Sequence, residues 1–241
     1  MVALEQGFDD VTHADSLNRP SFTSTGTPEP SLGDTRFRRL LTANDWAALP
    51  EGTRRRFSHR KVAGKATIYR GYVSMLRTSW AGRLLARLLI PIGAPLPTPN
   101  TGKSGLPSVV TVTEGADGET QHWTRLFATT DGFPQLIRSA KHFRGQTGLE
   151  EAIGWGITIA LKVDVIERVL TFTGVAYAVR VGRIRMPLPC WLVPGHLTVT
   201  HRDLSGSHGD GAFAFGLDLT HAWLGCLIHQ TAIYREVPDG E

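Results

Sequence analysis

Residues 108–129 read SVVTVTEGADGETQHWTRLFAT, and this stretch indicates the fold of the whole chain. β-Branched and aromatic residues fill both of its halves, Ser108–Thr113 and Thr120–Thr129. Between the halves lies Asp117-Gly118, a pair that favours the tight turn of a β-hairpin. The stretch is therefore predicted to form two antiparallel strands.

The same signals recur on both sides of this hairpin. Runs of β-branched and aromatic residues are separated by short turns, with no crossover helix between them, which implies antiparallel pairing. The further predicted strands are Lys65–Leu76, Gln135–Phe143, Ile153–Val163, Arg168–Val181, His196–Leu204, Ala212–Leu219 and Leu224–Tyr234. About nine strands favour a curved sheet or a barrel, because a flat sheet of that width would leave long edges.

Helical spacing precedes the strands. Phe37, Leu40 and Leu41 follow one helical pattern, and Pro50 suits the first turn of another that runs through Phe57. The predicted fold class is thus α+β, predominantly antiparallel β, with one or two N-terminal helices packed against the sheet. Residues 1–35, rich in Ser, Thr, Pro and acids, are predicted to be a disordered tail, and residues 36–236 a single β-rich domain.

Ser79 is placed to cap a further helix that runs to about Leu89. Two interpretations of this helix remain open, an ordinary core-facing helix and an amphipathic helix that touches a membrane. Its apolar side carries Trp80, Leu84, Leu85, Leu88 and Leu89, beside the basic pair Arg83 and Arg87. The simpler, core-facing interpretation is preferred. The Pro/Gly-rich segment that follows, residues 91–107, could cover a cavity as a flap.

The net charge of +4 hides an uneven distribution. Residues 1–35 hold six acids and one Arg, whereas residues 36–103 hold fourteen Lys or Arg and two acids. The basic segment could meet an anionic membrane surface. Nucleic acid is not expected as a partner, because no nucleic-acid-binding motif accompanies the charge. The first thirty residues lack the pattern of a secretory signal, so the expected location is cytoplasmic. If the basic segment meets a membrane, the expected location is membrane-peripheral.

Several cofactor motifs fail on inspection. Gly102-Lys103-Ser104 is not the end of a P-loop, because Pro97 stands where the first glycine is required. Gly154-Trp155-Gly156 does not begin a dinucleotide fingerprint, because Ile159 takes the third glycine position. With two cysteines and histidines of mixed strand parity, the sequence predicts no metal site and no cofactor.

The pattern most suggestive of a site is Trp123-Thr124-Arg125-Leu126-Phe127. The period of two in a strand puts Trp123, Arg125 and Phe127 on one face. If that face is the inner one, Arg125 needs a buried acid or the anionic group of a ligand as its partner. Glu150 and Glu151 are the candidate acids.

Several further short motifs occur in a fixed order over residues 36–235. They are Arg70-Gly71, Trp123-x-Arg125-x-Phe127, Glu151-x-x-Gly154, Pro187-Leu188-Pro189, Leu192-x-Pro194-Gly195, Phe213-x-Phe215 and Gly225. Together they resemble an uncharacterised bacterial domain-of-unknown-function family, whose members occur alone or C-terminal to reductase domains of the saccharopine-dehydrogenase or epimerase type. The chain departs from that family at Gln230 and Ala232, where such members carry a Tyr and a Gly.

The resemblance implies no established activity. It implies an accessory or ligand-binding role, with a reductase-type protein as a candidate partner. Three hypotheses follow. The leading one is a non-enzymatic domain that binds a lipid-like or small hydrophobic molecule, with an anionic head near Arg125. Its candidate ligand-binding residues are Arg70, Trp123, Arg125, Phe127, Glu151, Phe213 and Phe215.

The second hypothesis is a peripheral membrane-association module, which would use the basic segment 36–103 and the helix that begins after Ser79. The third is an accessory enzyme that acts on a reductase-linked metabolite. Its acid–base candidates are Asp131, Glu151 and His229, but their spacing gives no mutual geometry. An enzyme is therefore the less favoured class.

Overall fold

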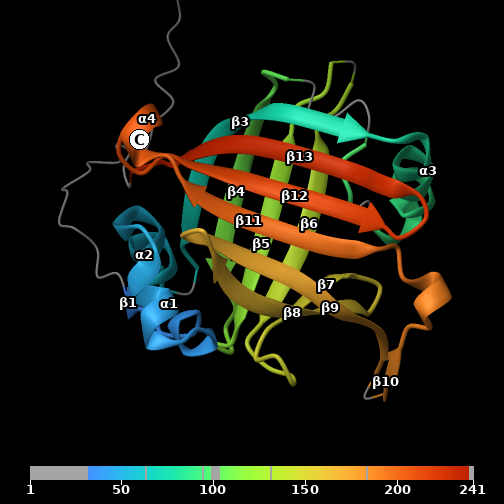
Figure 1. Cartoon of the computed structure of the whole chain (residues 1–241), viewed down its shortest axis with the longest axis horizontal. Helices are drawn as coiled ribbons and strands as arrows, with labels where there is room; N and C mark the ends of the chain where they lie inside the picture. The colour runs from blue at the N-terminus through green and yellow to red at the C-terminus, as the bar shows by residue number, and fades with distance from the viewer. Residues whose placement is uncertain are drawn as a thin grey trace, which may run out of the picture. The chain divides into compact units, whose positions relative to one another are not determined.

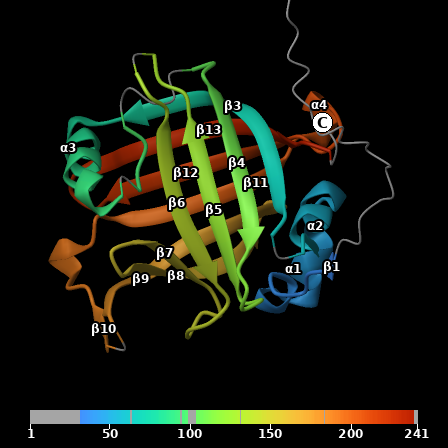
Figure 2. The ribbon, with the colours of Figure 1, turned by 180° about the vertical axis from the view of Figure 1, so that it is seen from behind.

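Ten antiparallel strands close into a barrel in the computed structural model, which describes residues 32–62, 64–93, 95–98, 104–130, 132–182 and 184–238. Each strand pairs with the next along the chain, and the ring closes where the last strand pairs with the first (Figures 1 and 2). The strands are β3 (Ala66–Thr78), β4 (Pro107–Glu114), β5 (Thr120–Phe127), β6 (Gln135–His142), β7 (Glu150–Gly154), β8 (Ile157–Ile166), β9 (Val169–Val181), β11 (His196–Asp203), β12 (Phe213–His221) and β13 (Gly225–Glu236).

The predicted antiparallel, barrel-like sheet is confirmed, but the strand count differs at one place. The segment 153–163 was predicted as one strand and instead belongs to two, β7 and β8, which reverse at Trp155 and Gly156. Both turn residues have positive φ, 47° and 76°. A Cβ on Gly156 would lie 2.1 Å from the Arg180 carbonyl oxygen, so the turn requires glycine there. A short extra strand, β10 (Ile184–Pro187), pairs with the end of β9 outside the ring.

Helices lie at both ends of the barrel (Figures 1 and 2). The N-terminal helices predicted from the sequence are present as η1 (Arg38–Leu40), α1 (Ala43–Ala48) and α2 (Glu51–Phe57). Thr42 caps α1 by accepting the Asp45 N–H, and Pro50 immediately precedes α2. The remaining helical elements are α3 (Trp80–Leu88), η2 (Ile90–Ile92), η3 (Cys190–Leu192) and α4 (Ser205–His208). Among the described residues, no helix has the length and apolarity to cross a membrane.

The helix α3 begins as predicted, because the Ser79 side chain accepts the Gly82 N–H. Its orientation contradicts the preferred core-facing interpretation. The helix buries its small residues, Ala81, Gly82 and Ala86, and leaves the side chains of Trp80, Leu84 and Leu88 exposed to solvent.

The described fold starts a few residues before the predicted boundary at residue 36. Strand β1 (Leu32–Gly33) pairs with β2 (His59–Arg60), and Asp34 is buried. Arg36 Nη2 lies 2.7 Å from Asp34 Oδ2 and 2.9 Å from a carboxylate oxygen of Glu114. The rest of the predicted tail, residues 1–31, lies outside the described residues.

The barrel is filled by aromatic side chains at the end near α1 and α2. The Phe37 ring packs edge-on against Phe57 and Phe143, with centroids 4.9 Å apart in each pair, and Phe172 lies 6.1 Å from Phe37. Burial of each such ring stabilises the fold by roughly 1.5–3 kcal/mol. This packing fills much of the barrel interior at the end near α1 and α2.

Candidate functional site

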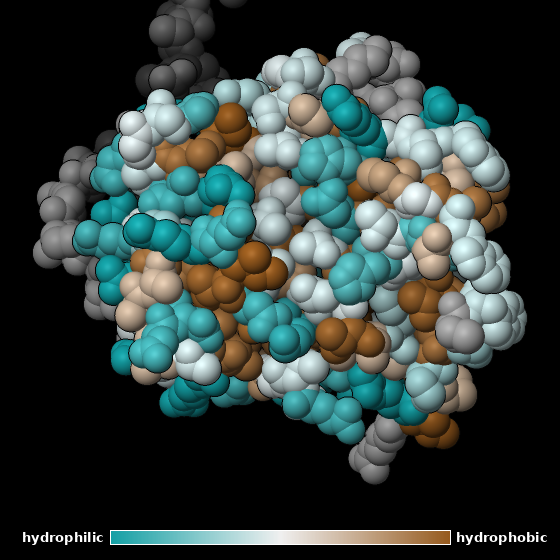
Figure 3. All heavy atoms as spheres, in the orientation of Figure 1, coloured by the Kyte–Doolittle hydropathy of each residue, from teal (hydrophilic) through white to brown (hydrophobic). Residues whose placement is uncertain are grey.

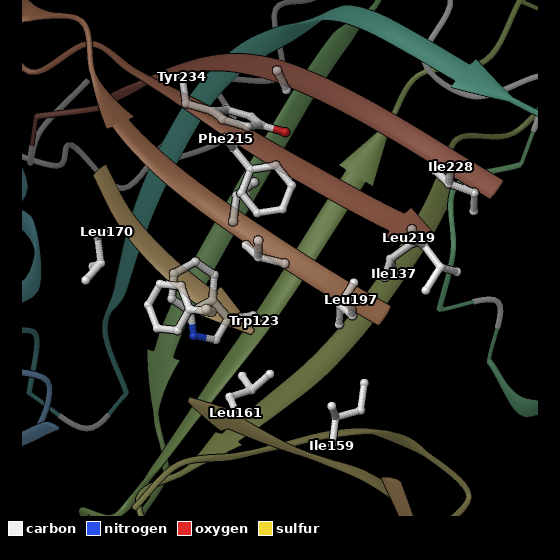
Figure 4. Packing of buried hydrophobic residues seen from close by; sticks show 14 of the residues in the cluster. Trp123, Ile137, Ile159, Leu161, Leu170, Leu197, Phe215, Leu219, Ile228 and Tyr234 are labelled. Atoms are coloured by element: carbon white, nitrogen blue, oxygen red, sulfur yellow. The ribbon is translucent and has the colours of Figure 1, made fainter. Parts of the chain in front are cut away.

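A cavity lies inside the barrel between the aromatic core and the end that carries α3. Its volume is about 90 Å³, counted as the space open to the centres of water molecules. One water molecule needs only about 10–15 Å³ by the same measure, so the cavity has room for a small organic molecule. Its walls are mostly apolar, and Figure 4 shows labelled side chains from strands on several sides pointing inward. The apolar lining includes Leu89, Leu96, Ile137, Ile153, Ile159, Leu197, Leu217 and Leu219.

Strand β5 contributes the pattern singled out in the sequence. Trp123, Arg125 and Phe127 all line the cavity, as the alternation along this strand predicts, while Leu126 points outward. The Arg125 side chain is only 13% exposed. It therefore needs a partner inside the barrel, because an unpaired buried guanidinium is costly.

The acid that meets Arg125 is Glu151 on β7. Arg125 Nη2 lies 3.8 Å from Glu151 Oε1, and Arg125 Nη1 donates a 3.1 Å hydrogen bond to Ser139 Oγ. A second cation shares the same acid, because Lys141 Nζ lies 3.1 Å from Glu151 Oε2. Glu150, the other candidate acid, ion-pairs instead with Arg144 and Arg185.

The charges of this cluster shift one another's pKa values. Burial alone would raise the pKa of Glu151, but Lys141 and Arg125 reverse this and bring the pKa down to about 2. Burial lowers the pKa of Lys141, and the neighbouring Arg125 adds to this effect against the attraction of Glu151. The cluster therefore holds two cations against one carboxylate, an excess of positive charge.

Three further polar atoms of this site lack a hydrogen-bond partner among the described residues. They are Trp123 Nε1, Gln230 Nε2 and His201 Nδ1, and each residue lines the cavity. Burial lowers the pKa of His201 well below its ordinary value, helped by the positive charges of Arg56, Lys141 and Arg125, so the imidazole is neutral. Unpaired buried donors are rare in folded proteins and point to a missing acceptor.

The seven predicted site residues do not all converge. Trp123, Arg125, Phe127, Glu151 and Phe215 line the cavity. Phe213 belongs to the adjacent packed core, where its ring lies 3.6 Å from the Arg56 guanidinium and 5.3 Å from Tyr69. Arg70 is exposed on the outer side of β3 and lines a separate basic groove with Arg55, Arg60 and Arg235, so it takes no part in the interior site.

The acid–base residues of the enzyme hypothesis are not brought together. Glu151 lies inside the barrel, whereas His229 lies on the outer side of β13, where its Nδ1 is 2.6 Å from Asp218 Oδ1. Asp131 lies outside the described residues. Within the described ranges, no three His, Cys, Asp or Glu side chains are grouped in a way that could hold a metal ion.

Sequence reasoning missed Ser139, Lys141, His201 and Gln230. The alternation of Ile137, Ser139 and Lys141 along the predicted strand Gln135–Phe143 contains the signal, because it places all three on one face. His201 is buried, and its Nδ1 has no hydrogen-bond partner among the described residues. Gln230 also lines the cavity.

A short piece of the Pro/Gly-rich loop covers the cavity. This cover segment, residues 95–98, places Pro95, Leu96 and Pro97 against the cavity. Gln135 at the start of β6 holds it, because its Nε2 donates to the Leu96 carbonyl over 2.9 Å and its Oε1 accepts the Thr98 N–H over 3.0 Å. Of the predicted flap, residues 91–107, this piece lines the cavity, and residues 94 and 99–103 lie outside the described residues.

The basic segment 36–103 does not form one surface. Arg36 is buried at the end near α1, Arg55 and Arg60 line the groove near α2, and Arg83 and Arg87 lie on α3 at the other end. Its high charge is therefore divided between both ends of the barrel.

Comparison with known proteins places this fold in a family. No curated protein and no solved structure matches the chain significantly. The family model described as Domain of unknown function (DUF4166) matches residues 49–233, which is most of the chain and all ten barrel strands except the last residues of β13. The protein therefore belongs to this family of domains of unknown function.

Proposed function

We propose that the barrel binds a small apolar molecule that carries a carboxylate, with the carboxylate held by Arg125 and Lys141. The observation that carries this proposal is the net positive charge of the buried cluster. Two cations, Arg125 and Lys141, share the single acid Glu151 inside a cavity with apolar walls. A buried charge without a partner is costly, so an anionic ligand would supply what the chain lacks.

A carboxylate fits the donors around the cavity. Its two oxygens offer about four acceptor positions, and a guanidinium such as that of Arg125 can bind both oxygens at once. Trp123 Nε1 and Gln230 Nε2 are donors without an acceptor among the described residues. The low pKa of buried Lys141 also favours this ligand class, because a second anion would stabilise its charged form.

The rest of the cavity favours an apolar ligand body. Ligand pockets of this kind have apolar walls and a few convergent polar groups, and here the polar groups gather around Arg125. The cover segment 95–98 adds Leu96 and Pro97 to the apolar lining. A flexible aliphatic carboxylate or one with a single ring suits the volume of the cavity and its apolar lining.

The proposal is tested by calorimetry with octanoate, benzoate and phenylacetate, and with octanol as a neutral match for octanoate. We expect at least one carboxylate to bind, and octanol to bind roughly ten- to hundredfold more weakly than octanoate, because a charge-assisted pair contributes roughly 1.5–3 kcal/mol. Arg125→Gln should abolish this preference while the protein still folds, because Lys141 and Glu151 remain as a balanced pair. Lys141→Met is the second such variant, since it leaves Arg125 with Glu151.

Arg202→Gln is the matched control, because Arg202 is exposed on β11, next to the inward-facing His201. It should leave binding unchanged. Failure of all three carboxylates to bind, or equal binding of octanoate and octanol, would contradict the proposal. Thermal unfolding of each variant separates loss of binding from loss of the fold.

A further inference from the structure

The five connections at one end of the barrel form a single surface. In an antiparallel barrel with neighbouring strands joined in order, alternate connections lie at the same end. The connections β3–β4, β5–β6, β7–β8, β9–β11 and β12–β13 therefore share the end that carries α3. We call it the portal end, because the cavity reaches it beneath Leu89, the cover segment and Pro194.

Each of these five connections exposes a large aromatic side chain. Trp80, Phe133, Trp155, Trp191 and Trp223, one from each connection, form what we call the aromatic rim, and they are between 68% and 95% exposed. The other two tryptophans, Trp46 and Trp123, are half-buried and buried. Two close backbone approaches tie the connections together, because a Cβ on Gly154 would lie 2.5 Å from the Ile92 oxygen and one on Gly195 would lie 2.3 Å from the Thr220 oxygen.

Aliphatic side chains widen this surface. On α3 the stripe Trp80, Leu84 and Leu88 has the i, i+4, i+8 spacing of one helix face, and it points to solvent because the small face of the helix packs on β13. Ile90, Leu192 and Leu224 are also exposed at this end. Hydrophobic patches are visible in Figure 3 on the side where Figure 1 places α3 and the end of β12. A group of exposed large apolar side chains at one end of a protein is typical of an interaction site.

The charge at the portal end has one dominant sign. Among the described residues of the five connecting segments, the charged side chains are those of Arg83, Arg87 and Arg185, and Arg185 pairs with Glu150. Arg83 and Arg87 are exposed on α3, beside its apolar stripe. Tryptophan rings settle at the interface between lipid and water, and nearby arginines attract anionic lipid headgroups.

We infer that the aromatic rim docks the protein on an anionic membrane surface, with the cover of the cavity toward the lipid. The rim residues belong to five different connections at one end of the barrel, an arrangement that suits a broad flat surface, and Arg83 and Arg87 on α3 supply positive charge beside them. Docking in this way requires no spanning segment. It also does not require the interior site to be occupied, so it stands apart from the proposed carboxylate binding.

The test is flotation of the full chain with phosphatidylcholine vesicles, with and without phosphatidylserine. We expect binding to the anionic vesicles that weakens as salt is raised. Trp155→Ala with Trp223→Ala should weaken this binding about tenfold, because both rings would otherwise enter the interface. Arg83→Glu with Arg87→Glu should weaken it by about tenfold or more, since each positive charge near the surface contributes. Both pairs of side chains are exposed, so the fold should persist.

Two controls make the result specific. Ile166→Ala removes an exposed apolar side chain at the β8–β9 connection, at the opposite end, and should leave vesicle binding unchanged. Arg125→Gln removes the interior cation and should also leave it unchanged, so failure of docking and failure of carboxylate binding can be told apart.

Three results would overturn the inference. The first is the absence of binding to anionic vesicles at low salt, and the second is binding that survives the double tryptophan substitution. The third is a dimer, detected by sedimentation, whose formation depends on Trp155 and Trp223, because the rim would then be an interface between two copies of the chain.

Discussion

Lys141 and Glu151 are direct neighbours across strands β6 and β7, and Lys141 Nζ lies 3.1 Å from Glu151 Oε2 inside the barrel. The strand register sets this pair, because Ala140 opposite Ala152 and His142 opposite Glu150 fix the two residues between them. Arg125 approaches the same carboxylate from β5. Two cations thus share a single acid, so the stability of the protein depends on that acid more than on either cation.

Glu151→Gln is therefore expected to destabilise the fold more than Arg125→Gln. The change leaves Arg125 and Lys141 without an acid inside the barrel, and breaking a buried pair in this way costs about 3–5 kcal/mol. Arg125→Gln leaves a balanced pair and should cost less. Urea unfolding of the two variants measures the difference, and equal stabilities would contradict the assigned charge balance.

Stability should also fall in acid because of Glu151. Its pKa is about 2 in the folded protein against an ordinary value of 4.5. Between these values the unfolded chain binds a proton that the folded protein does not, so acid favours unfolding. The free energy of unfolding should decrease from about pH 5 to about pH 2, by an amount on the order of a few kcal/mol from this residue. Urea unfolding across this range checks it, and the slope should be smaller in Glu151→Gln.

Arg36, at the opposite end of the barrel, should contribute to the stability of the fold as strongly as Glu151. It pairs with Asp34 and Glu114, and its Nη1 donates to the Gly118 carbonyl over 2.8 Å. Arg36→Ala leaves two buried carboxylates without their cation, and we expect a loss of about 3–5 kcal/mol in the free energy of unfolding. The exposed Arg38→Ala is the control and should stay within about 0.5 kcal/mol of the parent protein. Similar losses for both variants would show that the buried network is not the cause.

The sequence predicts a barrel-like sheet and one shared face for Trp123, Arg125 and Phe127, with Glu150 or Glu151 as the candidate acid, but not that this face is the inner one. The alternation of these residues is a local signal, whereas the side of the sheet that they face depends on how the whole sheet closes. Lys141 escapes prediction because a lysine in a strand is normally placed at the surface. Its burial depends on Glu151, which meets it only through the register of strands β6 and β7.

Two further features of the fold, the turn between β7 and β8 and the direction of α3, could not be predicted from the sequence because they depend on backbone geometry. Trp155 takes a positive φ in a two-residue turn, and no polar turn residue marks the break between β7 and β8. The direction of α3 depends on Gly82, because a Cβ there would lie 2.0 Å from the Leu227 oxygen on β13. Hydrophobic size alone points the helix inward, whereas this close approach selects its small face.

Gly82→Ala should consequently displace α3 from β13. The added methyl cannot fit beside the Leu227 carbonyl, so the helix must shift outward or lose its contact. We expect the protein to be destabilised by about 1–3 kcal/mol, as is typical of overpacking, although alanine is the better helix former. Thermal unfolding measures this loss. Gly206→Ala, where a Cβ meets no atom within 4 Å, is the control, and equal effects would argue against the close approach.

The cover of the cavity should loosen in Gln135→Ala. Gln135 holds the cover segment through its bonds to the Leu96 carbonyl and the Thr98 N–H, and the substitution removes both. Hydrogen exchange at the Thr98 amide should become faster, because opening of this segment no longer breaks those bonds.

For a carboxylate that binds in the cavity, such as octanoate, association and dissociation should both accelerate with little change in Kd. Gln146→Ala, in the exposed β6–β7 connection at the other end, is the matched control and should alter neither rate. Unchanged exchange at Thr98 in Gln135→Ala would show that these two bonds do not hold the cover segment.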